Sequence, residues 1–335
     1  MLAEFIEQLR NRQDLDEAAA EQALERVLRP ETPDEEIRAF LIALADKGET
    51  PEEIAGFARG MRRMAVRVRS RHEYFVDTAG TGGGRPTFNI STTAAFVIAG
   101  AGVPVAKHGN RAATSRCGSA DVLEALGIPT RRPAEVSQQA LDEIGICFLF
   151  APTHHPSMQR VAQIRRELGR RTIFNLLGPL TNPAGAPCQL IGVFAPELTE
   201  KLGKVLQRLG TRRSWVVHSR DGFDELSTAA GNRVAEVGNG DFQLFEFQRM
   251  PVSDVPPVGG TPEENAALLA GILAGEIQGG ALGVVLLNAA AAVHLATGMT
   301  FSEAYREAEA SVNDGKAERK LNQLREFYLD TEGIS

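Results

Sequence analysis

Residues 77–126 contain the pattern that most constrains how this chain folds. Four glycines lie within residues 80–84, and Asn89-Ile90-Ser91-Thr92 then opens an apolar helical stretch. A short β-rich run leads into Lys107-His108-Gly109-Asn110-Arg111. Glycines let backbone N–H groups approach an anion because no Cβ is in the way, and a helix N-terminus adds unpaired N–H donors. With the lysine and arginine that follow the second strand, the pattern predicts a polyphosphate cradle built from two adjacent βα turns.

Each part of this pattern also has a plainer explanation. A glycine cluster is more often a tight turn, the basic pentapeptide could be a solvated loop, and Ser91 could be a helix N-cap. All three within one strand–helix–strand unit favour the phosphate site. The spacing matches neither the P-loop pattern G-x-x-x-x-G-K-[ST] nor the dinucleotide pattern G-x-G-x-x-G. The sequence therefore indicates a phosphate site outside both of these nucleotide-binding classes.

Three segments, GTGG at 80–83, TFNIST at 87–92 and KHGNR at 107–111, resemble the anthranilate phosphoribosyltransferase family in order and spacing. The resemblance covers nearly the whole chain and continues through Ala151-Pro152-Thr153-His154-His155-Pro156, Arg165-Arg166-Glu167-Leu168-Gly169, Asn175–Leu180 with Asn182-Pro183, and Asp221-Gly222-Phe223-Asp224-Glu225. It implies an enzyme of tryptophan biosynthesis that joins anthranilate to 5-phosphoribosyl 1-diphosphate and releases pyrophosphate.

The resemblance also implies which residues bind the substrates and a metal ion. The implied substrate-binding residues are Gly80, Gly82, Gly83, Thr87, Asn89, Ile90, Ser91, Thr92, Lys107, His108, Gly109, Asn110, Arg111, Ser115, Ser119, His155 and Arg165, with Thr81 in the same loop. The implied cofactor is Mg²⁺, with Ser91, Asp224 and Glu225 as ligands, because magnesium prefers oxygen ligands and bridges substrate phosphates with few protein contacts. Two adjacent acidic residues usually lie on the protein surface without a binding role. These two follow a β-rich run, and α/β proteins bind their ligands at the loop ends of strands.

The acceptor implied by the resemblance is a planar aromatic amine with a carboxylate. Arg165 is the family position for anthranilate, and a guanidinium fits a carboxylate well. Asn110 would hydrogen-bond the amine or the carboxylate, and His108 and His155 would line the aromatic slot. We predict that no strong general base is needed, because the neutral amine already has an available lone pair. Catalysis would depend on positioning by Asn110, Arg165 and His108 and on charge stabilisation at an oxocarbenium-like transition state.

The glycine loop departs from the family pattern at one place. The family usually has an acid followed by glycine directly after GTGG, whereas this chain has Gly84-Arg85-Pro86 and one residue fewer before Thr87. We hypothesise that Arg85 contacts phosphate directly and lowers the dependence on a high magnesium concentration.

Composition limits the classes of partner. A net charge of −7 argues against a broad nucleic-acid-binding surface, which would normally be basic, so no nucleic-acid partner is predicted. The three cysteines, Cys117, Cys147 and Cys188, show no metal or disulfide spacing, which favours a reducing cytosol and a cytoplasmic protein. The N-terminus does not resemble a secretory signal, and the longest apolar stretch, 281–296, is too short to span a bilayer comfortably. No membrane partner is predicted.

Periodicity predicts an α/β fold with a mainly parallel central sheet flanked by helices, plus a small all-helical domain. This is the architecture that nucleoside phosphorylases and phosphoribosyltransferases of this kind share. The strand candidates are Val103–Ala106, Ile146–Phe150, Leu190–Ala195 and Trp215–His218, with a hairpin of Val234–Val237 and Gln243–Phe247. The helix candidates after residue 74 are Ser91–Ala99, Ser119–Leu126, Glu135–Ile144, Leu198–Leu209, Glu264–Gly275, Gly280–Thr297, Ser302–Val312 and Lys316–Tyr328. Before residue 74 the chain reads as helices, with predicted N-terminal caps at Thr32 and Thr50.

The domain division combines this pattern with the resemblance. Residues 1–72 would form the helical domain, completed by about 157–184, which the resemblance folds back onto the N-terminal helices. Residues 73–156 and 185–335 would form the α/β domain that binds 5-phosphoribosyl 1-diphosphate. The apolar helix faces of the small domain, and the resemblance, favour a homodimer through that domain.

Two rival functions share this architecture. A pyrimidine-type nucleoside phosphorylase would use inorganic phosphate and a nucleoside, but the complete KHGNR segment, Arg165 and the Asp224-Glu225 pair favour the anthranilate enzyme. A non-catalytic nucleic-acid-binding relative would carry a basic groove and lack the two acids, and both the acids and the negative net charge argue against it.

Overall fold

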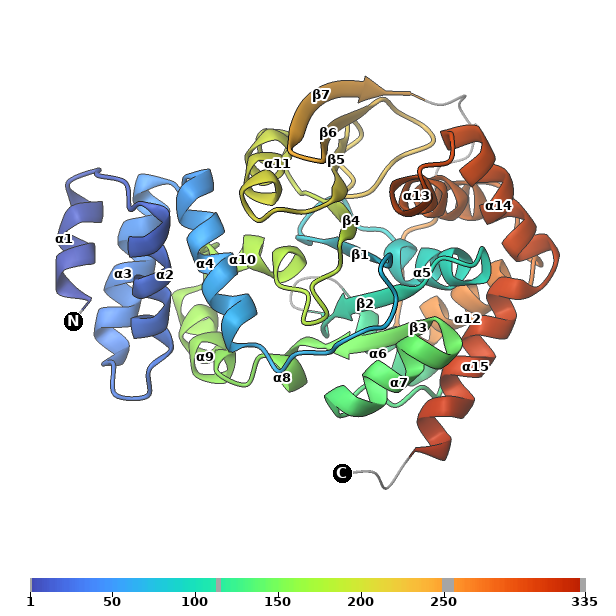
Figure 1. The fold of residues 1–335 in the computed structure, drawn as a ribbon, viewed down its shortest axis with the longest axis horizontal. Helices are drawn as coiled ribbons and strands as arrows, with labels where there is room; N and C mark the ends of the chain where they lie inside the picture. The colour runs from blue at the N-terminus through green and yellow to red at the C-terminus, as the bar shows by residue number, and fades with distance from the viewer. Residues whose placement is uncertain (1, 113–115, 249–255, 332–335) are drawn as a thin grey trace.

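The fold is built around one twisted sheet. The structure, a computed structural model, describes residues 2–112, 116–248 and 256–331, and within them seven strands follow the order β3-β2-β1-β4-β5-β6-β7 (Figure 1). The strands are β1 (Val76–Gly80), β2 (Val105–Gly109), β3 (Ile146–Phe150), β4 (Cys188–Gly192), β5 (Arg213–Ser219), β6 (Asn232–Gly238) and β7 (Asp241–Phe247). The first five run parallel, and β6 and β7 are antiparallel to their neighbours. The predicted fold class is confirmed.

The strand predictions differ from the structure mainly where polar residues lie inside strands, but the predicted strand Leu190–Ala195 also begins two residues late and ends three residues beyond β4, which is Cys188–Gly192. β3 matches its prediction, but β1 was missing from the candidates because Asp77, Thr78 and glycine interrupt any apolar run. β2 continues through Lys107 and His108, both buried, beyond the predicted end at Ala106. The β6–β7 hairpin turns on Asn239-Gly240, both with positive φ, as a two-residue turn of this composition requires.

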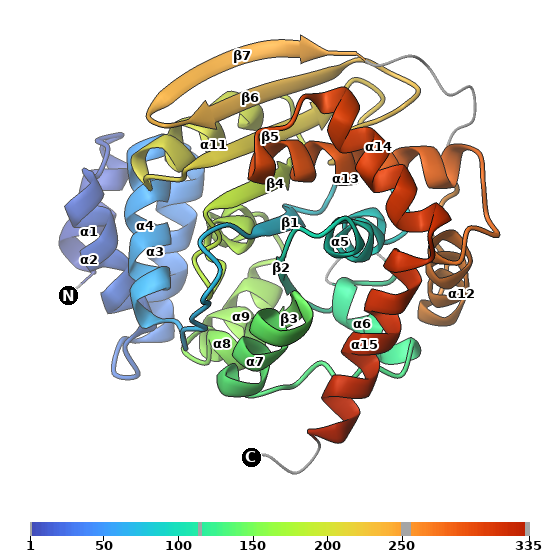
Figure 2. The same cartoon turned by 45° about the vertical axis from the view of Figure 1, so that its right-hand side comes forward.

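Two hydrophobic cores lie on opposite faces of the sheet, because successive strand residues point to opposite sides. In β5, Trp215 and Val217 belong to one core and Val216 to the other. The first core contains the packing of α5 (Ile90–Gly100), α13 (Gly280–Thr297), α14 (Phe301–Asn313) and α15 (Lys316–Asp330), which lie on the same side of the sheet in Figures 1 and 2. The remaining helices around this core are α6 (Ser119–Ala125), α7 (Ala134–Ile144) and α12 (Pro262–Leu273). On the other face α11 (Glu197–Arg208) packs on β5 and β6.

Helix α13 has the length and composition of a membrane span but lies inside the fold. Among the helices of the described residues, it is the one long and apolar enough to cross a membrane, and 83% of that window is buried. It packs against α5, α14 and β4. These contacts make α13 a core helix of the α/β part.

The N-terminal helices form a separate layer beside the sheet (Figure 1). They are α1 (Ala3–Arg10), α2 (Glu17–Leu28), α3 (Asp34–Lys47) and α4 (Pro51–Met64), and α4 also contacts α11. The later helices α9 (Met158–Leu168) and α10 (Phe174–Leu177) join them, since α9 contacts α2 and α3 and α10 contacts α4. The short elements α8 (Ala151–His154) and η1 (Gly178–Leu180) lie before and after this pair. The boundaries at 72, 157 and 184 stay a prediction.

The two predicted helix caps have different outcomes. Thr50 caps α4 in a full capping box with Glu53, as predicted. The prediction for Thr32 is wrong: Pro33 is the N-cap of α3, and the Thr32 hydroxyl donates to the Arg26 carbonyl oxygen at 2.5 Å instead. The hydroxyl thereby closes the α2–α3 turn.

Candidate active site

The candidate site lies where the strand order reverses. From β1 the chain builds β2 and β3 on one side of the sheet, and β4 then pairs with β1 on the other side. Ligands of open α/β sheets bind at the carboxyl ends of the strands at such a switch point. A cavity of about 20 Å³ lies there, enough for about one water-sized sphere. Its lining includes Gly80, Ser91, Gly192, Asp224 and Glu225.

The glycine loop after β1 is held against Asp224. The Gly82 N–H donates to Asp224 Oδ2 at 3.0 Å, and Gly82 and Gly83 both have positive φ. A Cβ on Gly80 would lie 2.9 Å from Asp224 Oδ2, and one on Gly84 would lie 2.8 Å from Asp224 Oδ1. An acid at position 84 in this loop path would press its side chain onto another carboxylate. Glycine at position 84 avoids this contact.

Asp224 and Glu225 have the properties of a divalent-cation site. Burial raises the pKa of both carboxyls, and for Glu225 the charge of Asp224 raises it further, while Thr87 and Lys107 act in the opposite direction. Glu225 Oε2 is buried and has no hydrogen-bond partner among the described residues. An unpartnered buried carboxylate oxygen beside a second acid fits Mg²⁺, which takes most of its ligands from water and phosphate. No group of three or more His, Cys, Asp or Glu suited to a metal occurs in the described part of the chain, so a dedicated all-protein cage is not what this site offers.

Two residues that the sequence did not single out fix the acidic loop. Asn288 of α13 accepts the Leu226 N–H at 3.1 Å and donates to the Leu226 carbonyl at 3.0 Å. A Cβ on Gly192, the last residue of β4, would lie 1.5 Å from the Asp224 carbonyl oxygen. The sequence did contain a signal for Asn288, because it is an amide within an alanine-rich apolar helix. A buried amide needs hydrogen-bond partners, so such a residue indicates a polar contact inside the fold.

A buried carboxylate fixes the end of β2. Asp77 accepts the His108 N–H at 3.1 Å and an N–H of the Asn182 side chain at 2.8 Å, and Asn182 also donates to the Ala106 carbonyl. Lys107 is buried and donates to the Thr78 carbonyl at 2.5 Å; burial lowers its pKa, while the charges of Asp77 and Glu225 raise it. Lys107 therefore lies beneath the acidic pair rather than in solvent. Neither Asp77 nor Asn182 was among the predicted site residues.

His108 and His155 form a buried pair with ring centroids 5.4 Å apart. His108 Nδ1 donates to the Gly178 carbonyl at 3.1 Å, and His155 Nε2 donates to the Thr181 carbonyl at 3.0 Å. Burial lowers the pKa of His155 to about 4 and that of His108 well below its usual range. Both rings are therefore neutral near pH 7, which suits the wall of a slot for an aromatic ring.

Arg165 lies in α9, with its guanidinium carbon 5.6 Å from the centroid of the Phe174 ring. Burial lowers its pKa. No carboxylate forms an ion pair with Arg165 in the described part of the chain, and the neighbouring Arg166 is exposed. A half-buried guanidinium with no acidic partner is suited to an incoming carboxylate.

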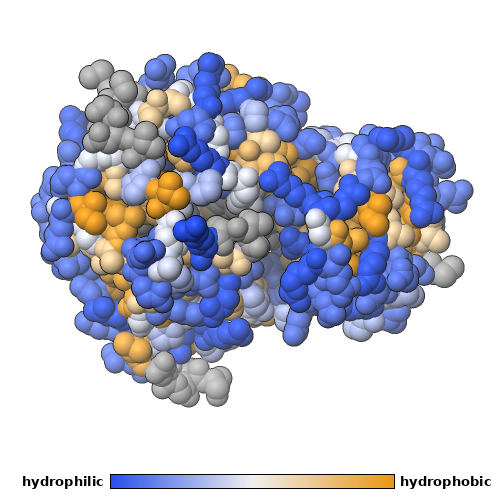
Figure 3. Space-filling view, turned by 180° about the vertical axis from the view of Figure 1, so that it is seen from behind, coloured by the Kyte–Doolittle hydropathy of each residue, from blue (hydrophilic) through white to orange (hydrophobic). Residues whose placement is uncertain are grey.

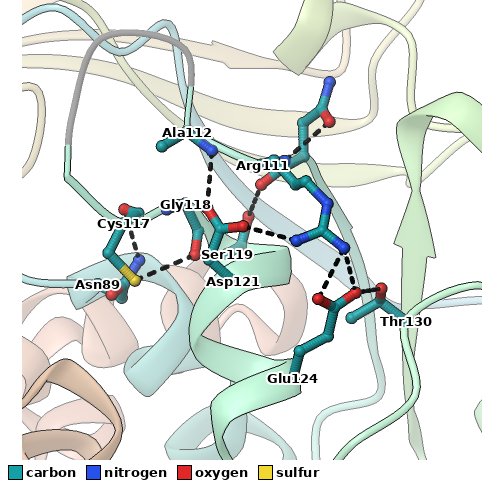
Figure 4. A network of polar contacts seen from close by, with 10 residues as sticks. Asn89, Arg111, Ala112, Cys117, Gly118, Ser119, Asp121, Glu124 and Thr130 are labelled. Atoms are coloured by element: carbon teal, nitrogen blue, oxygen red, sulfur yellow. Dashed lines mark hydrogen bonds and ion pairs between the residues drawn. The ribbon is translucent and has the colours of Figure 1, made fainter. Parts of the chain in front are cut away.

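The loop after β2 is folded onto α6 (Figure 4). Arg111 donates to Asp121 at 2.9 Å and to both Glu124 carboxylate oxygens at 2.7 Å, and its backbone N–H donates to Asn110 Oδ1 at 2.8 Å. Ser119 Oγ donates to the Asn110 carbonyl at 3.4 Å. The Arg111 guanidinium is therefore paired with Asp121 and Glu124. Its predicted contact with phosphate requires these ion pairs to break. Ser115 lies outside the described residues.

The start of α5 supplies the remaining predicted groups. Asn89, not Ser91, is the N-cap, and its side chain accepts from Asn265 Nδ2 at 2.8 Å and donates to the Cys117 carbonyl at 3.3 Å. Ser91 reaches the cavity, whereas Ile90 and Thr92 are buried and present their backbone to the turn. In the glycine loop, the Thr81 hydroxyl accepts the Phe194 N–H at 3.1 Å, which ties the loop to the end of β4.

Comparison with known proteins places the chain among glycosyl transferases. Residues 72–318 match the α/β domain of the glycosyl transferase family, and residues 3–65 match its helical bundle domain. The chain is 50% identical over 322 residues to anthranilate phosphoribosyltransferase of Moorella thermoacetica, covering 93% of this chain and 94% of that protein. It is 49% identical over 334 residues to that of Syntrophobacter fumaroxidans, covering 97% and 98%.

Solved structures agree with these sequence relationships. Anthranilate phosphoribosyltransferase from Thermus thermophilus superposes with a TM-score of 0.90 at 41% identity, covering 97% of this chain and 99% of that one. The Saccharomyces cerevisiae enzyme in complex with PRPP and Mg superposes with a TM-score of 0.88 at 26% identity, covering 98% of each chain. The strand order and helical layer described above are thus those of solved relatives.

Proposed function

Because this chain belongs to the anthranilate phosphoribosyltransferases of the glycosyl transferase family, we propose that its switch-point site transfers phosphoribosyl from 5-phosphoribosyl 1-diphosphate to the amine of anthranilate. The reaction is a step of tryptophan biosynthesis. The observation that carries the assignment of the site is the Gly82–Asp224 hydrogen bond, which joins the glycine loop to the acidic pair. That contact puts the two groups a diphosphate–metal complex needs, backbone N–H donors and carboxylate oxygens, at one strand edge.

The donor would occupy the cradle between β1, α5 and the loop after β2. Backbone N–H groups of the glycine loop and of the α5 N-terminus would hold its phosphates, with Lys107 beneath them. Asp224 and Glu225, with Ser91, would hold Mg²⁺, and the unpartnered Glu225 Oε2 is the atom that such an ion would satisfy. When bound, magnesium supplies positive charge to the leaving diphosphate.

The acceptor would lie between the β2 end and the α9–α10 segment. Arg165 would bind the anthranilate carboxylate, Asn110 would orient the amine, and the neutral His108 and His155 would form the wall of the slot. The amine nitrogen attacks C1 of the ribose while the C1–O bond to diphosphate breaks, with the electron pair leaving on oxygen. The extra proton leaves the nitrogen after attack, so this chain needs positioned groups rather than a strong base.

The proposal extends to assembly and location. The enzyme would act as a cytoplasmic homodimer that pairs through the helical domain, with no nucleic-acid or membrane partner. In Figure 3 apolar patches appear on the helical part and also on the larger part, to which a narrower waist joins it. In the same proposal, the helical domain consists of residues 1–72 and about 157–184. The α/β domain consists of residues 73–156 and 185–335. Light scattering of the purified chain would give the oligomeric state.

The decisive experiment is loss of anthranilate fluorescence on mixing the protein with 5-phosphoribosyl 1-diphosphate and magnesium. Loss that requires all components, with equimolar pyrophosphate release, supports the proposal. No loss, together with phosphorolysis of thymidine or uridine, would assign the site to the nucleoside phosphorylase alternative. Tight binding in a gel shift at moderate salt would instead support a nucleic-acid-binding role.

A further inference from the structure

Arg171 crosses from the helical layer to the switch point. It lies between α9 and α10, yet its guanidinium carbon is 3.7 Å from the centroid of the Phe194 ring, which follows β4. Its Nη2 donates to the Gly83 carbonyl at 3.4 Å. A Cβ on Gly83 would lie 2.9 Å from the same nitrogen, so glycine at this position leaves the space that the guanidinium occupies. One side chain thus contacts the loops after both central strands, β1 and β4.

The cationic side chains that were predicted to bind phosphate at this site already have partners within the protein. The chain has a net charge of −7, and Asp224 and Glu225 add negative charge at the cavity itself. Lys107 is buried and directed to the Thr78 carbonyl, and Arg111 is paired with Asp121 and Glu124. Within the described residues, these two predicted phosphate-binding cations are therefore already engaged with the protein.

Two arginines beside the glycine loop differ from these cations. Arg171 lies over Phe194, and Arg85 lies over Phe223 with 5.0 Å between its guanidinium carbon and the ring centroid. Neither forms an ion pair with a carboxylate in the described part of the chain. Stacking holds a guanidinium in place while leaving its N–H edge exposed, and a guanidinium carries five N–H donors, of which the Gly83 contact of Arg171 uses one. Both residues are exposed to solvent at the site edge.

We propose that Arg171 is a donor-binding residue that grips the diphosphate of 5-phosphoribosyl 1-diphosphate across the glycine loop from Arg85. This inference rests on the proposed function, since it deepens the assignment of the same site. In the bound state the Arg171 guanidinium exchanges its long contact with a neutral carbonyl for charge-assisted contacts with diphosphate oxygens. The aromatic ring of Phe194 remains its platform.

The position of Arg171 in the chain gives this contact a second consequence. Its neighbour Arg170 forms an ion pair with Asp46 of α3 at 2.7 Å, and the backbone N–H of Thr172 donates to Asn175 Oδ1 at 2.9 Å. Residue 171 is therefore anchored on both sides to the helical layer that also carries Arg165. Diphosphate binding by Arg171 would draw this layer towards the sheet and bring the acceptor arginine with it.

The test compares Arg171→Ala and Arg171→Lys with Arg166→Ala, which removes an exposed arginine of α9 that takes no part in anchoring residue 171. Calorimetry with inorganic pyrophosphate and magnesium measures the diphosphate contact directly, and inhibition by ribose 5-phosphate reports the other end of the donor. We expect R171A to weaken pyrophosphate binding about tenfold or more, because a hydrogen bond to a charged group contributes that much. Arg171→Lys should retain part of the affinity, and R166A should match the wild type.

Kinetics complete the test. R171A should raise KM for the donor most and raise KM for anthranilate by less, because the acceptor arginine is no longer drawn towards the sheet. Inhibition by ribose 5-phosphate and the melting temperature should stay unchanged. Unchanged pyrophosphate affinity in R171A, or an equal loss for ribose 5-phosphate, overturns the assignment. A wild-type protein that consumes no anthranilate refutes the proposed function instead, so the two failures are distinguishable.

Discussion

The Gly82 amide donates to the Asp224 carboxylate across 142 residues of sequence, at 3.0 Å. The donor group of the proposed phosphate loop and the acceptor group of the proposed metal site are therefore paired with each other. In the proposed function, the glycine loop would bind the diphosphate and Asp224 would bind the metal ion, so the two partners would serve neighbouring ligands. The arrangement keeps both groups in register without leaving either unsatisfied.

Glu225→Gln should abolish most of the activity and raise the magnesium concentration needed for half-maximal rate. The substitution keeps the size of the side chain but removes the charge of the buried oxygen that has no partner in the described structure. Magnesium titrations of the anthranilate fluorescence assay would measure both effects. Glu197→Gln, which changes an exposed acid at the start of α11, is the matched control and should behave like the wild type.

His155 should make the folded state sensitive to acid. Its pKa is lowered from 6.5 to about 4, so the unfolded chain binds a proton that the folded chain rejects. The stability from this group is full above pH 6.5 and falls by about 3 kcal/mol as the pH drops towards about 4. Urea unfolding across that range should show a shallower loss in His155→Gln. An identical pH profile for the variant would contradict the assignment of the shift.

Arg165→Ala should raise KM for anthranilate about 10- to 100-fold, since it removes a charge-assisted contact with the carboxylate. KM for the donor should change little. Arg166→Ala removes the exposed neighbour and should leave both constants unchanged. Steady-state kinetics with each substrate varied in turn would show the difference, and equal effects of the two variants would remove Arg165 from the acceptor site.

Arg85→Ala should shift the magnesium dependence of the rate to higher concentration and raise KM for the donor about 2- to 10-fold, the range expected for one exposed charged hydrogen bond. The guanidinium lies over Phe223, the residue before Asp224, so it can share the diphosphate charge with the metal. An unchanged magnesium curve together with an unchanged donor KM would reject a phosphate contact by Arg85.

Gly192→Ala should lower the free energy of unfolding by about 1–3 kcal/mol, the usual cost of overpacking. The added Cβ would lie 1.5 Å from the Asp224 carbonyl oxygen, so the acidic loop must move. Gly238→Ala is the control, because a Cβ there meets its nearest atom at 3.7 Å. Thermal unfolding of both variants, followed by magnesium titration, would show whether loss of stability and loss of the acidic loop go together.

Strand β3 and helix α13 could be predicted from the sequence because each is a continuous apolar segment. The alternation of strand-like and helix-like segments predicted the α/β fold. It did not reveal β1, whose Asp77 and Thr78 are buried through hydrogen bonds that only tertiary structure supplies. The end of β2 was misplaced for the same reason, since Lys107 and His108 read as loop residues until their partners are known.

The sequence indicated some groups of the candidate site but not the contacts that hold them. Gly80 at the start of the glycine loop, Ser91, Asp224 and Glu225 do line one cavity, as the combined motifs indicated. Contacts between distant segments were beyond reach: Asn182 with Asp77, Asn288 with Leu226, and Arg171 with Gly83 each join residues at least 62 positions apart. Spacing along a chain carries no information about such pairs without an alignment.

The contacts of α9 and α10 with the N-terminal helices also bear on synthesis of the protein. Helices α1–α4 emerge from the ribosome long before residues 158–177, so the residues of α2, α3 and α4 that contact α9 and α10 stay uncovered while β1, β2 and β3 are being made. If the chain were divided between residues 65 and 72, α1–α4 would be separated from α9 and α10, the two later helices that pack against them. The helical layer therefore has its full set of helices only when residues 158–177 are made in the same chain.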